Sequence, residues 1–450
     1  MPDDLVKVRC PIHGFVALRR QSELPVLNHP AMQRLRRIRQ LAMAYLAFPG
    51  AMHTRFDHSL GVLHVADCMA QAVGIEGDVL SNIRLAGLVH DVGHGPFSHV
   101  SEYAFHQLSG GAGETEELHE AVTREILRHE LRGEVLSGQQ ADAVQALLSP
   151  KEYGRAVERD IISGPLDADK LDYLLRDSYF CGVRYGVYDL PRLLDTMTVV
   201  RDPGALSYLG VREEDLAAVD QYVLARYNLG QVYFHKVRRI ADAMLVRAIV
   251  LAVHEGHPEI KQLFTPKRMT ASYMRAYLRA DDEGLVRSIL EGPRRPSADL
   301  MGRLWRRDLV KQVVSAPLSR CSDAAFKQKI TQLGFRQELE QEIANICSKR
   351  QPWLVFVDYQ AGRPVRKGAG QEGPEVIPVV GTDRVTRNYD SLSPVFRQGA
   401  PRGEEHLRIY APVQGDSDDT RKRIRSELER NIAALVGLEG PVPPTPGPGA

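Results

Sequence analysis

The chain has 450 residues, of which 43% are apolar and 26% are charged. This balance is ordinary for a globular protein and excludes a disordered or fibrous chain. The 58 basic and 57 acidic residues leave a net charge of +1, so no overall field would draw nucleic acid or anionic lipid to the chain. Nucleic acid and membranes are therefore not expected partners, and the length alone predicts about three structural units.

No window approaches the roughly 20 unbroken apolar residues that a membrane-spanning helix needs, and the first residues contain no apolar leader segment. The cysteines are odd in number, widely spaced and without a C-x-x-C pair: Cys10, Cys68, Cys181, Cys321 and Cys347. Such a set fits a reducing compartment rather than a disulfide framework or a zinc ribbon. We therefore expect a cytoplasmic protein.

The chain opens with alternating apolar residues at 5–20 around a Pro-Ile-His-Gly turn, which predicts a short hairpin. From about residue 30 to 300, apolar residues recur at three- and four-residue spacing, which predicts helices. The clearest of these segments are 58–74, 80–92, 119–131, 166–179, 190–200 and 216–253. Because strand signals are scarce in this region, we expect a mainly α-helical core over residues 1–305.

A smaller α+β lobe is expected over residues 306–440. Its predicted elements are a charged helix at about 322–349, strands at 353–359, 376–381 and 407–413, and a last helix from 418. That helix should pack on the strands, because it places an apolar stripe on one face: Ile424, Leu428, Ile432 and Leu435. Residues 361–375 and the Pro- and Gly-rich residues 441–450 have little to bury, which predicts a mobile loop and a disordered tail.

The histidines are unevenly distributed, since eight of the 15 fall between residues 53 and 119. The adjacent pair His90-Asp91 ends an apolar helix, and His94 and His99 follow it. An imidazole beside a carboxylate suits a divalent metal. The dipeptide alone is weak evidence, because chance supplies it in most long chains and a lone helical histidine is more often a packing residue.

Two further segments strengthen the metal hypothesis. Upstream, His58 lies near the start of a predicted helix beside Arg55, whose guanidinium can grip phosphate. Downstream, Asp169, Tyr173 and Asp177 are spaced at i, i+4 and i+8, so they share one helical face. Two carboxylates and a phenol make a poor core stripe, so we predict that this face lines a cavity.

In their order along the chain, His58, His90-Asp91 and Asp169 resemble the H…HD…D pattern of the HD-domain metal phosphohydrolase superfamily. Four motifs, at 48–62, 86–99, 167–177 and 232–237, are similar to those of the deoxynucleoside triphosphate (dNTP) triphosphohydrolases. The resemblance implies a mainly α-helical HD-domain core with an N-terminal hairpin and a C-terminal α+β lobe. It also implies hydrolysis of a dNTP to a deoxynucleoside and tripolyphosphate.

The resemblance implies a divalent metal cofactor, Mg²⁺, Mn²⁺ or Fe²⁺, whose identity the sequence does not fix. The implied ligands are His58, His90, Asp91 and Asp169. The ion would polarise the α-phosphate and help to generate the attacking hydroxide.

The implied catalytic residues are His94, His99, His119 and Glu102. His94 or His99 would support proton transfer to the departing 5′ oxygen, and His119 would orient them, because imidazole can be charged or neutral near pH 7. Glu102 stands where the family has an aspartate and reaches one methylene further. Reduced or re-poised activity is therefore expected.

The implied substrate contacts fall into two groups. Arg55, Lys170 and Lys236 would hold the triphosphate, although surface solvation also explains such cations. The implied sugar contacts are Gln40 and Asp177 on the 3′ hydroxyl, Leu41 and Tyr233 against the 2′ position, and Tyr173 beneath the ribose. Crowding at C2′ would reject a ribonucleotide by collision, whereas simple core packing explains Leu41 and Tyr233 equally well.

A nucleotide activator site is implied near the N-terminus. Asn28 takes the place of the family's guanine-sensing aspartate, and Gln33, Arg34 and Arg36 furnish a basic edge beside it. Because asparagine offers one acceptor and one donor group, guanine selectivity should be weakened. An ordinary solvated helix face is the commoner explanation for these residues. The resemblance also implies a homo-oligomer, with a tetramer as the expected form.

Two other functions stay open. One is a phosphomonoesterase or nuclease of the same superfamily, against which the near-zero net charge and the 7% aromatic content argue mildly. The other is a nucleotide sensor without turnover, which the departures at Glu102 and Asn28 motivate. The complete set of metal-ligand residues favours catalysis instead.

Overall fold

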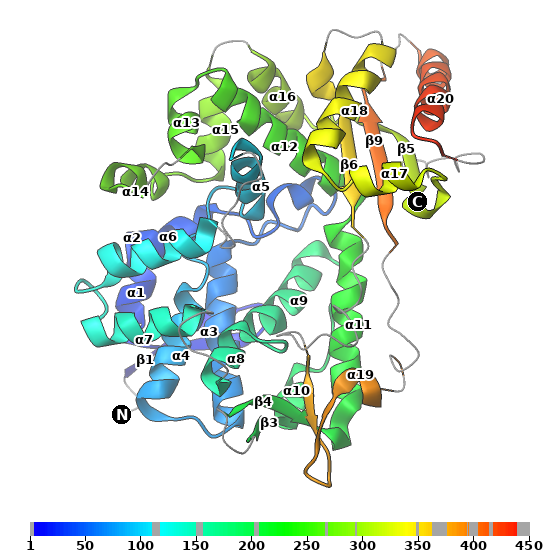
Figure 1. Ribbon diagram of the computed structural model, residues 1–450. Coiled ribbons are helices and arrows are strands. Elements are labelled where there is room, and N and C mark those ends of the chain that lie inside the picture. Colours follow the sequence, from blue (N-terminus) through cyan, green and yellow to red (C-terminus); the bar gives the residue numbers. More distant parts are fainter. Residues whose placement is uncertain are drawn as a thin grey trace.

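The computed structural model describes residues 4–109, 118–149, 156–201, 207–265, 269–292, 295–347, 351–361, 376–393, 395, 404–413 and 417–438. The predicted tail at 441–450 and nearly all of the predicted loop at 361–375 lie outside these residues. A large helical body and a smaller α+β lobe make up the chain (Figure 1). Within the described residues, no helix combines the length and the apolar character needed to cross a membrane.

The helical body begins with the N-terminal hairpin and includes the helices as far as Trp305. Its helices are α1 (Leu24–Asn28), α2 (Pro30–Arg34), α3 (Arg55–Ala72), α4 (Gly77–Val89), α5 (His99–Leu108), α6 (Leu118–Ile126), α7 (Gly138–Leu148), α8 (Val157–Ser163), α9 (Ala168–Cys181), α10 (Leu190–Thr196), α11 (Leu216–Tyr233), α12 (Lys236–His254), α13 (Pro258–Phe264), α14 (Ala271–Tyr277), α15 (Asp282–Leu290) and α16 (Pro296–Trp305). Helix α3 is central, since it packs against both α4 and α9.

Local chemistry fixes where the two helices nearest the site begin. At α3, the Asp57 carboxylate accepts the Thr54 N–H at 2.9 Å and the Thr54 hydroxyl accepts the Asp57 N–H, which forms a capping box. At α9, the Asp167 carboxylate accepts the Lys170 N–H at 2.8 Å. Helix α9 ends at Gly182, whose φ of +69° lies in the left-handed region that favours glycine.

In the part of the chain that the structure describes, three small sheets accompany the helices. Strands β1 (Leu5–Cys10) and β2 (Gly14–Arg19) form the predicted antiparallel hairpin, with Leu5 opposite Arg19. The second sheet has the order β3-β4-β7-β8 and the third has the order β5-β9-β6. Their strands are β3 (Met197–Val200), β4 (Tyr208–Arg212), β5 (Lys311–Pro317), β6 (Phe356–Gln360), β7 (Pro378–Val380), β8 (Thr386–Asn388) and β9 (His406–Ala411).

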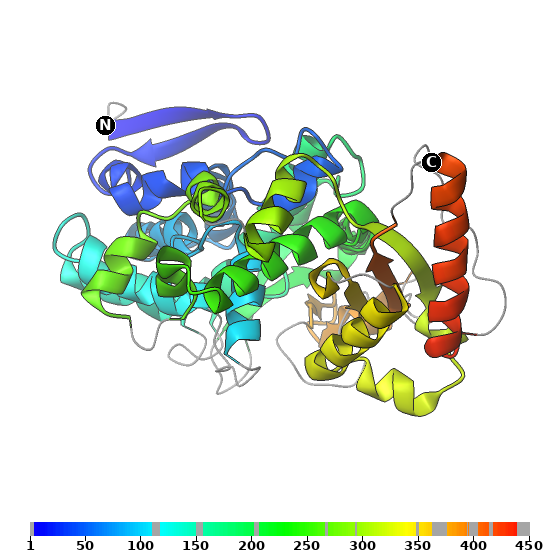
Figure 2. The same ribbon diagram turned by 90° about the horizontal axis from the view of Figure 1, so that it is seen from above.

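The C-terminal lobe has its own hydrophobic cluster around the β5-β9-β6 sheet. Its helices are α17 (Ala324–Lys329), α18 (Leu333–Ile346) and α20 (Asp418–Leu435). Helix α20 begins where the sequence predicts and buries Leu428 and Ile432, so the prediction that it packs on the lobe is confirmed. Figure 2 shows this lobe at the opposite end of the molecule from the hairpin.

The structure corrects four of the predicted elements. The predicted charged helix at about 322–349 is two helices, α17 and α18, separated by residues 330–332. The segment 190–200 is not one helix, because α10 ends at Thr196 and Met197–Val200 continues as β3. The segment 216–253 is two helices that meet at Phe234 and His235. The predicted strand at 376–381 does not join the C-terminal lobe. Its β7 pairs in parallel with β4, so Val211 lies opposite Val379 in the helical body. The domain boundary near residue 305 stays a prediction.

Candidate active site

Three helices bring the four predicted metal ligands together. His58 lies in the first turn of α3, His90 caps the end of α4 and Asp169 lies in the first turn of α9. His58 Nε2 is 2.9 Å from Asp169 Oδ1 and 3.7 Å from Asp91 Oδ2. His90 Nε2 is 3.3 Å from Asp91 Oδ1. The ligand atoms of His58, His90 and Asp169 lie within 4.8 Å of one another, so one cation can reach all three. Asp91 lies beside this group, with a different oxygen facing each histidine.

The donor set fits a divalent metal. The Nδ1–H of His90 donates to the Gly87 carbonyl at 2.8 Å, which turns Nε2 inward with its lone pair available. That buried Nε2 has no hydrogen-bond partner. Two adjacent ligand atoms that each lie about 2.1 Å from an octahedral ion are about 3.0 Å apart. This separation matches the 2.9 Å between His58 Nε2 and Asp169 Oδ1. Asp169 is 37% exposed, so the cluster opens to solvent on that side.

Electrostatics favour positive charge at this position. Burial would lower the pKa of His58, but hydrogen bonds to Asp169 and Asp172 outweigh it and raise the pKa to about 10. The Asp169 and Asp172 carboxylates therefore stabilise positive charge at His58, and a metal ion there would have to replace the ring proton on Nε2.

A buried carboxylate that the sequence analysis missed orients His58. Asp172 Oδ2 is 2.8 Å from His58 Nδ1, and Oδ1 is 2.6 Å from His13 Nε2 in the hairpin turn. The Arg176 guanidinium donates to both oxygens at 2.8 and 2.9 Å. Burial raises the pKa of Asp172, but Arg176 and the histidines hold it well below its usual range. Asp172 is therefore an ionised partner that fixes the His58 tautomer.

The sequence did carry a signal for Asp172. It stands four residues before Arg176 on α9, a spacing at which opposite charges meet. Gly61 in the middle of α3 is a second signal, because a Cβ there would collide with the Asp172 carboxylate and the Arg176 guanidinium. His13 and Asp172 are 159 positions apart, so no local pattern reveals the rest of this network.

We expect Asp172→Asn to weaken metal binding by roughly 10- to 100-fold, the usual effect of losing a partner behind a metal ligand. Asparagine keeps the size of the side chain but loses the charge that holds His58. Titration calorimetry with Mn²⁺ measures the effect, with folding checked by thermal melting. The control is Asp142→Asn, which removes an exposed carboxylate paired with Arg132. An unchanged Mn²⁺ affinity in Asp172→Asn would contradict this role.

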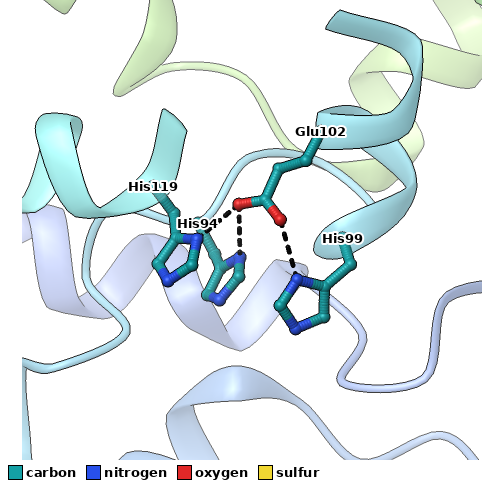
Figure 3. Close-up of side chains that lie close together, drawn as sticks. All are labelled: His94, His99, Glu102 and His119. Atoms are coloured by element: carbon teal, nitrogen blue, oxygen red, sulfur yellow. Dashed lines mark hydrogen bonds and ion pairs between the residues drawn. The ribbon is translucent and has the colours of Figure 1, made fainter. Parts of the chain in front are cut away.

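The predicted catalytic residues form a second cluster, in which the Glu102 carboxylate lies between imidazole rings (Figure 3). His99 Nδ1 is 2.7 Å from Glu102 Oε2, and His119 Nδ1 contacts Glu102 Oε1. Burial raises the pKa of Glu102, but the hydrogen bonds from His119 and His99 hold it well below its usual range. The Glu102 carboxylate therefore contacts both His119 and His99.

Geometry separates this cluster from the metal centre. The rings of His94 and His119 stack with centroids 4.0 Å apart and planes inclined by 13°. Two nearly parallel imidazoles cannot both direct an in-plane lone pair at one ion. Burial, reinforced by Arg55, holds the pKa of His94 well below its usual range, so this ring is neutral at pH 7. The arrangement therefore suits proton transfer better than metal binding.

Asp91 and Arg55 join the two clusters. Asp91 Oδ1 lies 3.3 Å from His94 Nε2 as well as 3.3 Å from His90 Nε2. The Arg55 guanidinium donates to Asp91 Oδ2 at 2.6 Å and to the Ser98 hydroxyl at 2.9 Å. Burial raises the pKa of Asp91, but Arg55 and the histidines lower it further, so the carboxylate is ionised. The Arg55 guanidinium and the Asp91 carboxylate thus connect the predicted metal ligands with the second cluster of histidines.

The predicted sugar contacts gather around Asp177. Its Oδ2 accepts the Tyr233 hydroxyl at 2.6 Å, and its Oδ1 is 2.8 Å from His53 Nε2, a residue to which the sequence analysis gave no role. The Tyr173 ring lies 6.4 Å from that of Tyr233. The backbone N–H of Gln40 donates to the His53 carbonyl at 3.0 Å. The buried side-chain Oε1 of Gln40 has no hydrogen-bond partner. Leu41 follows directly and is buried.

The predicted triphosphate contacts differ in their surroundings. Arg55 is buried between the clusters, as described above. The Lys170 ammonium lies at the start of α9, where it contacts Asp167 and donates to the Gly164 carbonyl at 3.1 Å. Lys236 is the first residue of α12 and is partly buried. The phosphate-binding roles of all three stay predictions.

The structure corrects the predicted basic edge of the activator site. Arg34 is not on this edge, because it is buried and donates to the carbonyls of Val92 at 3.1 Å and His94 at 2.6 Å. Asn28 is exposed, and Arg36 donates to Gln33 Oε1 at 2.8 Å while its guanidinium covers the Phe56 ring at 3.6 Å. Arg34 thus supports the loop that carries His94. An activator role for the other residues stays a prediction.

Known protein families match two segments of the chain. Residues 55–177 match the HD domain, and residues 188–370 match the HD associated region. An uncharacterised protein of Methanocaldococcus jannaschii is 32% identical over 95% of this chain and 84% of its own length. The structure of a phosphohydrolase from Bacteroides thetaiotaomicron has the same fold, with a TM-score of 0.74, 20% identity and coverage of 91% of this chain and 100% of that one.

The deoxynucleoside triphosphate triphosphohydrolase SAMHD1 of Homo sapiens is 30% identical over 56% of this chain and 45% of its own length. The chain therefore spans a little under half of that relative. The HD-domain match covers all four residues of the metal-ligand set, from His58 to Asp169. The chain belongs to the HD-domain phosphohydrolase family and is a relative of the SAMHD1 dNTP triphosphohydrolases.

Proposed function

We propose that this protein is a metal-dependent hydrolase that converts a dNTP and water to a deoxynucleoside and tripolyphosphate. One observation carries the proposal: Asp91 Oδ1 lies 3.3 Å from both His90 Nε2 in the metal-ligand set and His94 Nε2 in the imidazole cluster. A phosphorus atom held at this junction would be within reach of both a Lewis acid and proton-transfer groups.

Hydrolysis forms a bond from a water oxygen to the α-phosphorus and breaks the bond from that phosphorus to O5′, which then takes a proton. A divalent ion held by His58, His90, Asp91 and Asp169 would polarise an α-phosphate oxygen and lower the pKa of a bound water. His99 is suited to protonate O5′, because Glu102 holds its Nδ1 and the ring is 54% exposed. The neutral, buried His94 can accept a proton but cannot supply the one that O5′ takes.

Arg55 would add positive charge beside the α-phosphate, where it already contacts Asp91. Lys170 and Lys236 would bind the outer phosphates, and Lys170 must leave Asp167 to do so. In this proposal Asp177 and Gln40 bind the 3′ hydroxyl, since the Gln40 Oε1 has no partner of its own. Leu41 and Tyr233 exclude a 2′ hydroxyl, and Tyr173 lies beneath the sugar.

The proposal extends to assembly and control. We infer a homo-oligomer, with a tetramer as the expected form, and a nucleotide activator that meets Asn28, Gln33 and Arg36. Both follow from the relationship to SAMHD1. Size-exclusion chromatography with light scattering, in the presence and absence of each nucleotide, tests them together.

Product analysis tests the reaction directly. Purified protein is incubated with each dNTP and each ribonucleoside triphosphate, with Mg²⁺, Mn²⁺ or Fe²⁺, and the products are separated by ion exchange. We expect tripolyphosphate and deoxynucleoside from dNTPs and at least about tenfold slower turnover of ribonucleotides, because a clash worth 1.4 kcal/mol already gives that factor. Release of orthophosphate or pyrophosphate would refute the proposal. Binding without product at stoichiometric enzyme would identify a nucleotide sensor.

A further inference from the structure

The loop that joins the two clusters contains a strained turn. Phe97 and Ser98 have φ angles of 60° and 55°, in the left-handed region that residues with a Cβ rarely adopt. The turn lies between His94 and His99, so its conformation decides how far apart these rings lie and where they point. A strained turn persists only when its surroundings hold it.

One distant carboxylate provides that support. Asp282, the first residue of α15, is 1% exposed. Its Oδ1 accepts the Phe97 N–H at 2.6 Å, and its Oδ2 accepts the Arg39 N–H at 3.0 Å. The same Oδ2 is 3.4 Å from Arg39 Nη1. Asp282 therefore bridges the strained turn and the segment that leads into Gln40.

Ser98 closes the network on its other side. Its hydroxyl donates to the Arg39 carbonyl at 2.8 Å and accepts from Arg55 Nε at 2.9 Å. Arg55 in turn donates to Asp91. A short chain of hydrogen bonds thus runs from Asp282 through the Phe97–Ser98 turn to the metal-ligand set.

Helix capping does not explain Asp282. The neighbouring Asp281 is the residue that caps α15, because its carboxylate accepts the Gly284 N–H at 2.8 Å. The Asp282 carboxylate instead faces the loop. Burial raises the pKa of Asp282 to about 7, against the opposing effect of the hydrogen bonds from Arg39 and Phe97. A buried carboxylate costs stability, so its presence at this position calls for a function.

We propose that Asp282 is a positioning residue of the active site, which holds the His94–His99 loop and the Arg39–Gln40 segment at a fixed separation. It lies outside the matched HD domain, in the HD associated region, so that region completes the site. Asp282 touches no reacting atom in this proposal. Its effect on turnover rests on the proposed function, whereas its effect on the loop does not.

The test compares Asp282→Ala, Asp282→Asn and the control Glu283→Gln in the full-length, metal-loaded protein. Glu283 is the adjacent carboxylate, 49% exposed, and is 2.7 Å from Arg39 Nη2, so its loss removes a charge near Arg39 without touching Phe97. Hydrogen exchange by mass spectrometry follows peptides over residues 93–104 and 36–44. We expect exchange at least about tenfold faster in Asp282→Ala and unchanged exchange in Glu283→Gln.

Turnover provides the second measurement. We expect kcat to fall by roughly 100-fold in Asp282→Ala with metal content unchanged, because small misplacements of reacting groups have effects of this size. Asp282→Asn retains one acceptor oxygen, so its kcat should fall less than that of Asp282→Ala. Wild-type exchange and wild-type kcat in folded Asp282→Ala would overturn the proposal. If that variant does not fold, Asp282→Asn takes its place in both measurements. If the wild-type protein hydrolyses no dNTP, the proposed function fails and the exchange rates alone decide the role of Asp282.

Discussion

Replacing His90 and Asp91 together with alanine is expected to remove the bound metal and lower turnover by roughly 10⁴-fold or more. The estimate follows because a bound metal supplies several kcal/mol of transition-state stabilisation and each 1.4 kcal/mol is a factor of ten. The double variant leaves His58 and Asp169 as an incomplete ligand pair and deprives Arg55 of its 2.6 Å partner. Metal content after gel filtration and the rate of tripolyphosphate release measure the two effects.

The control for this variant replaces exposed residues of the same types, Asp78 on α4 and His106 on α5. The pair Asp78→Ala and His106→Ala should retain the metal and the wild-type rate. A His90→Ala, Asp91→Ala variant that retains wild-type turnover would contradict the assignment of these residues to the metal centre. Loss of turnover with the metal still bound would show that His90 and Asp91 are needed for the reaction but do not hold the metal.

Replacing Glu102 with glutamine is expected to lower kcat by about 10²- to 10³-fold while metal content stays unchanged. Glutamine keeps the length of the side chain but replaces one acceptor oxygen with a donor, so it cannot accept from both His99 and His119. Hydrogen bonds from these rings hold the pKa of Glu102 well below its usual range, so the carboxylate is ionised throughout the neutral range. Titration of Glu102 itself should therefore add no inflection to the wild-type profile of kcat between about pH 6 and 8.

Glu102→Asp is the informative companion variant, because it keeps the charge and shortens the side chain by one methylene. It should retain contact with one imidazole and lose the other, which places its kcat between those of the wild-type protein and Glu102→Gln. Equal activity in all three proteins would contradict a catalytic role for this carboxylate. Loss of metal from Glu102→Gln would instead place a metal ion in the imidazole cluster.

Much of the site could be predicted because its chemistry follows short-range spacing. The face of α9 with Asp169, Tyr173 and Asp177 follows from the helical period. The H…HD…D order led to His58, His90 and Asp169, which the structure brings together with Asp91 beside them. The supporting residues could not be found in this way. His13 and Asp282 each act on residues more than 150 positions away along the chain, and helical periodicity carries no such information.

The errors in the predicted fold have the same cause. Met197–Val200 is a short apolar run directly after a helix, and periodicity alone does not distinguish it from a further helical turn. Strand β7 was assigned to the wrong unit because its partner β4 lies far earlier in the chain. Arg34 lies close to the exposed residues Arg36 and Arg37, yet it is buried because the carbonyls of Val92 and His94 need a donor.

The central claim is that His58, His90, Asp91 and Asp169 share one divalent cation. An anomalous-scattering map from crystals soaked in Mn²⁺ tests it most directly. The account predicts one strong peak within about 2.5 Å of the Nε2 atoms of both histidines and of a carboxylate oxygen of each aspartate. A dominant peak among His94, His99, Glu102 and His119, or no peak at either cluster, would contradict it.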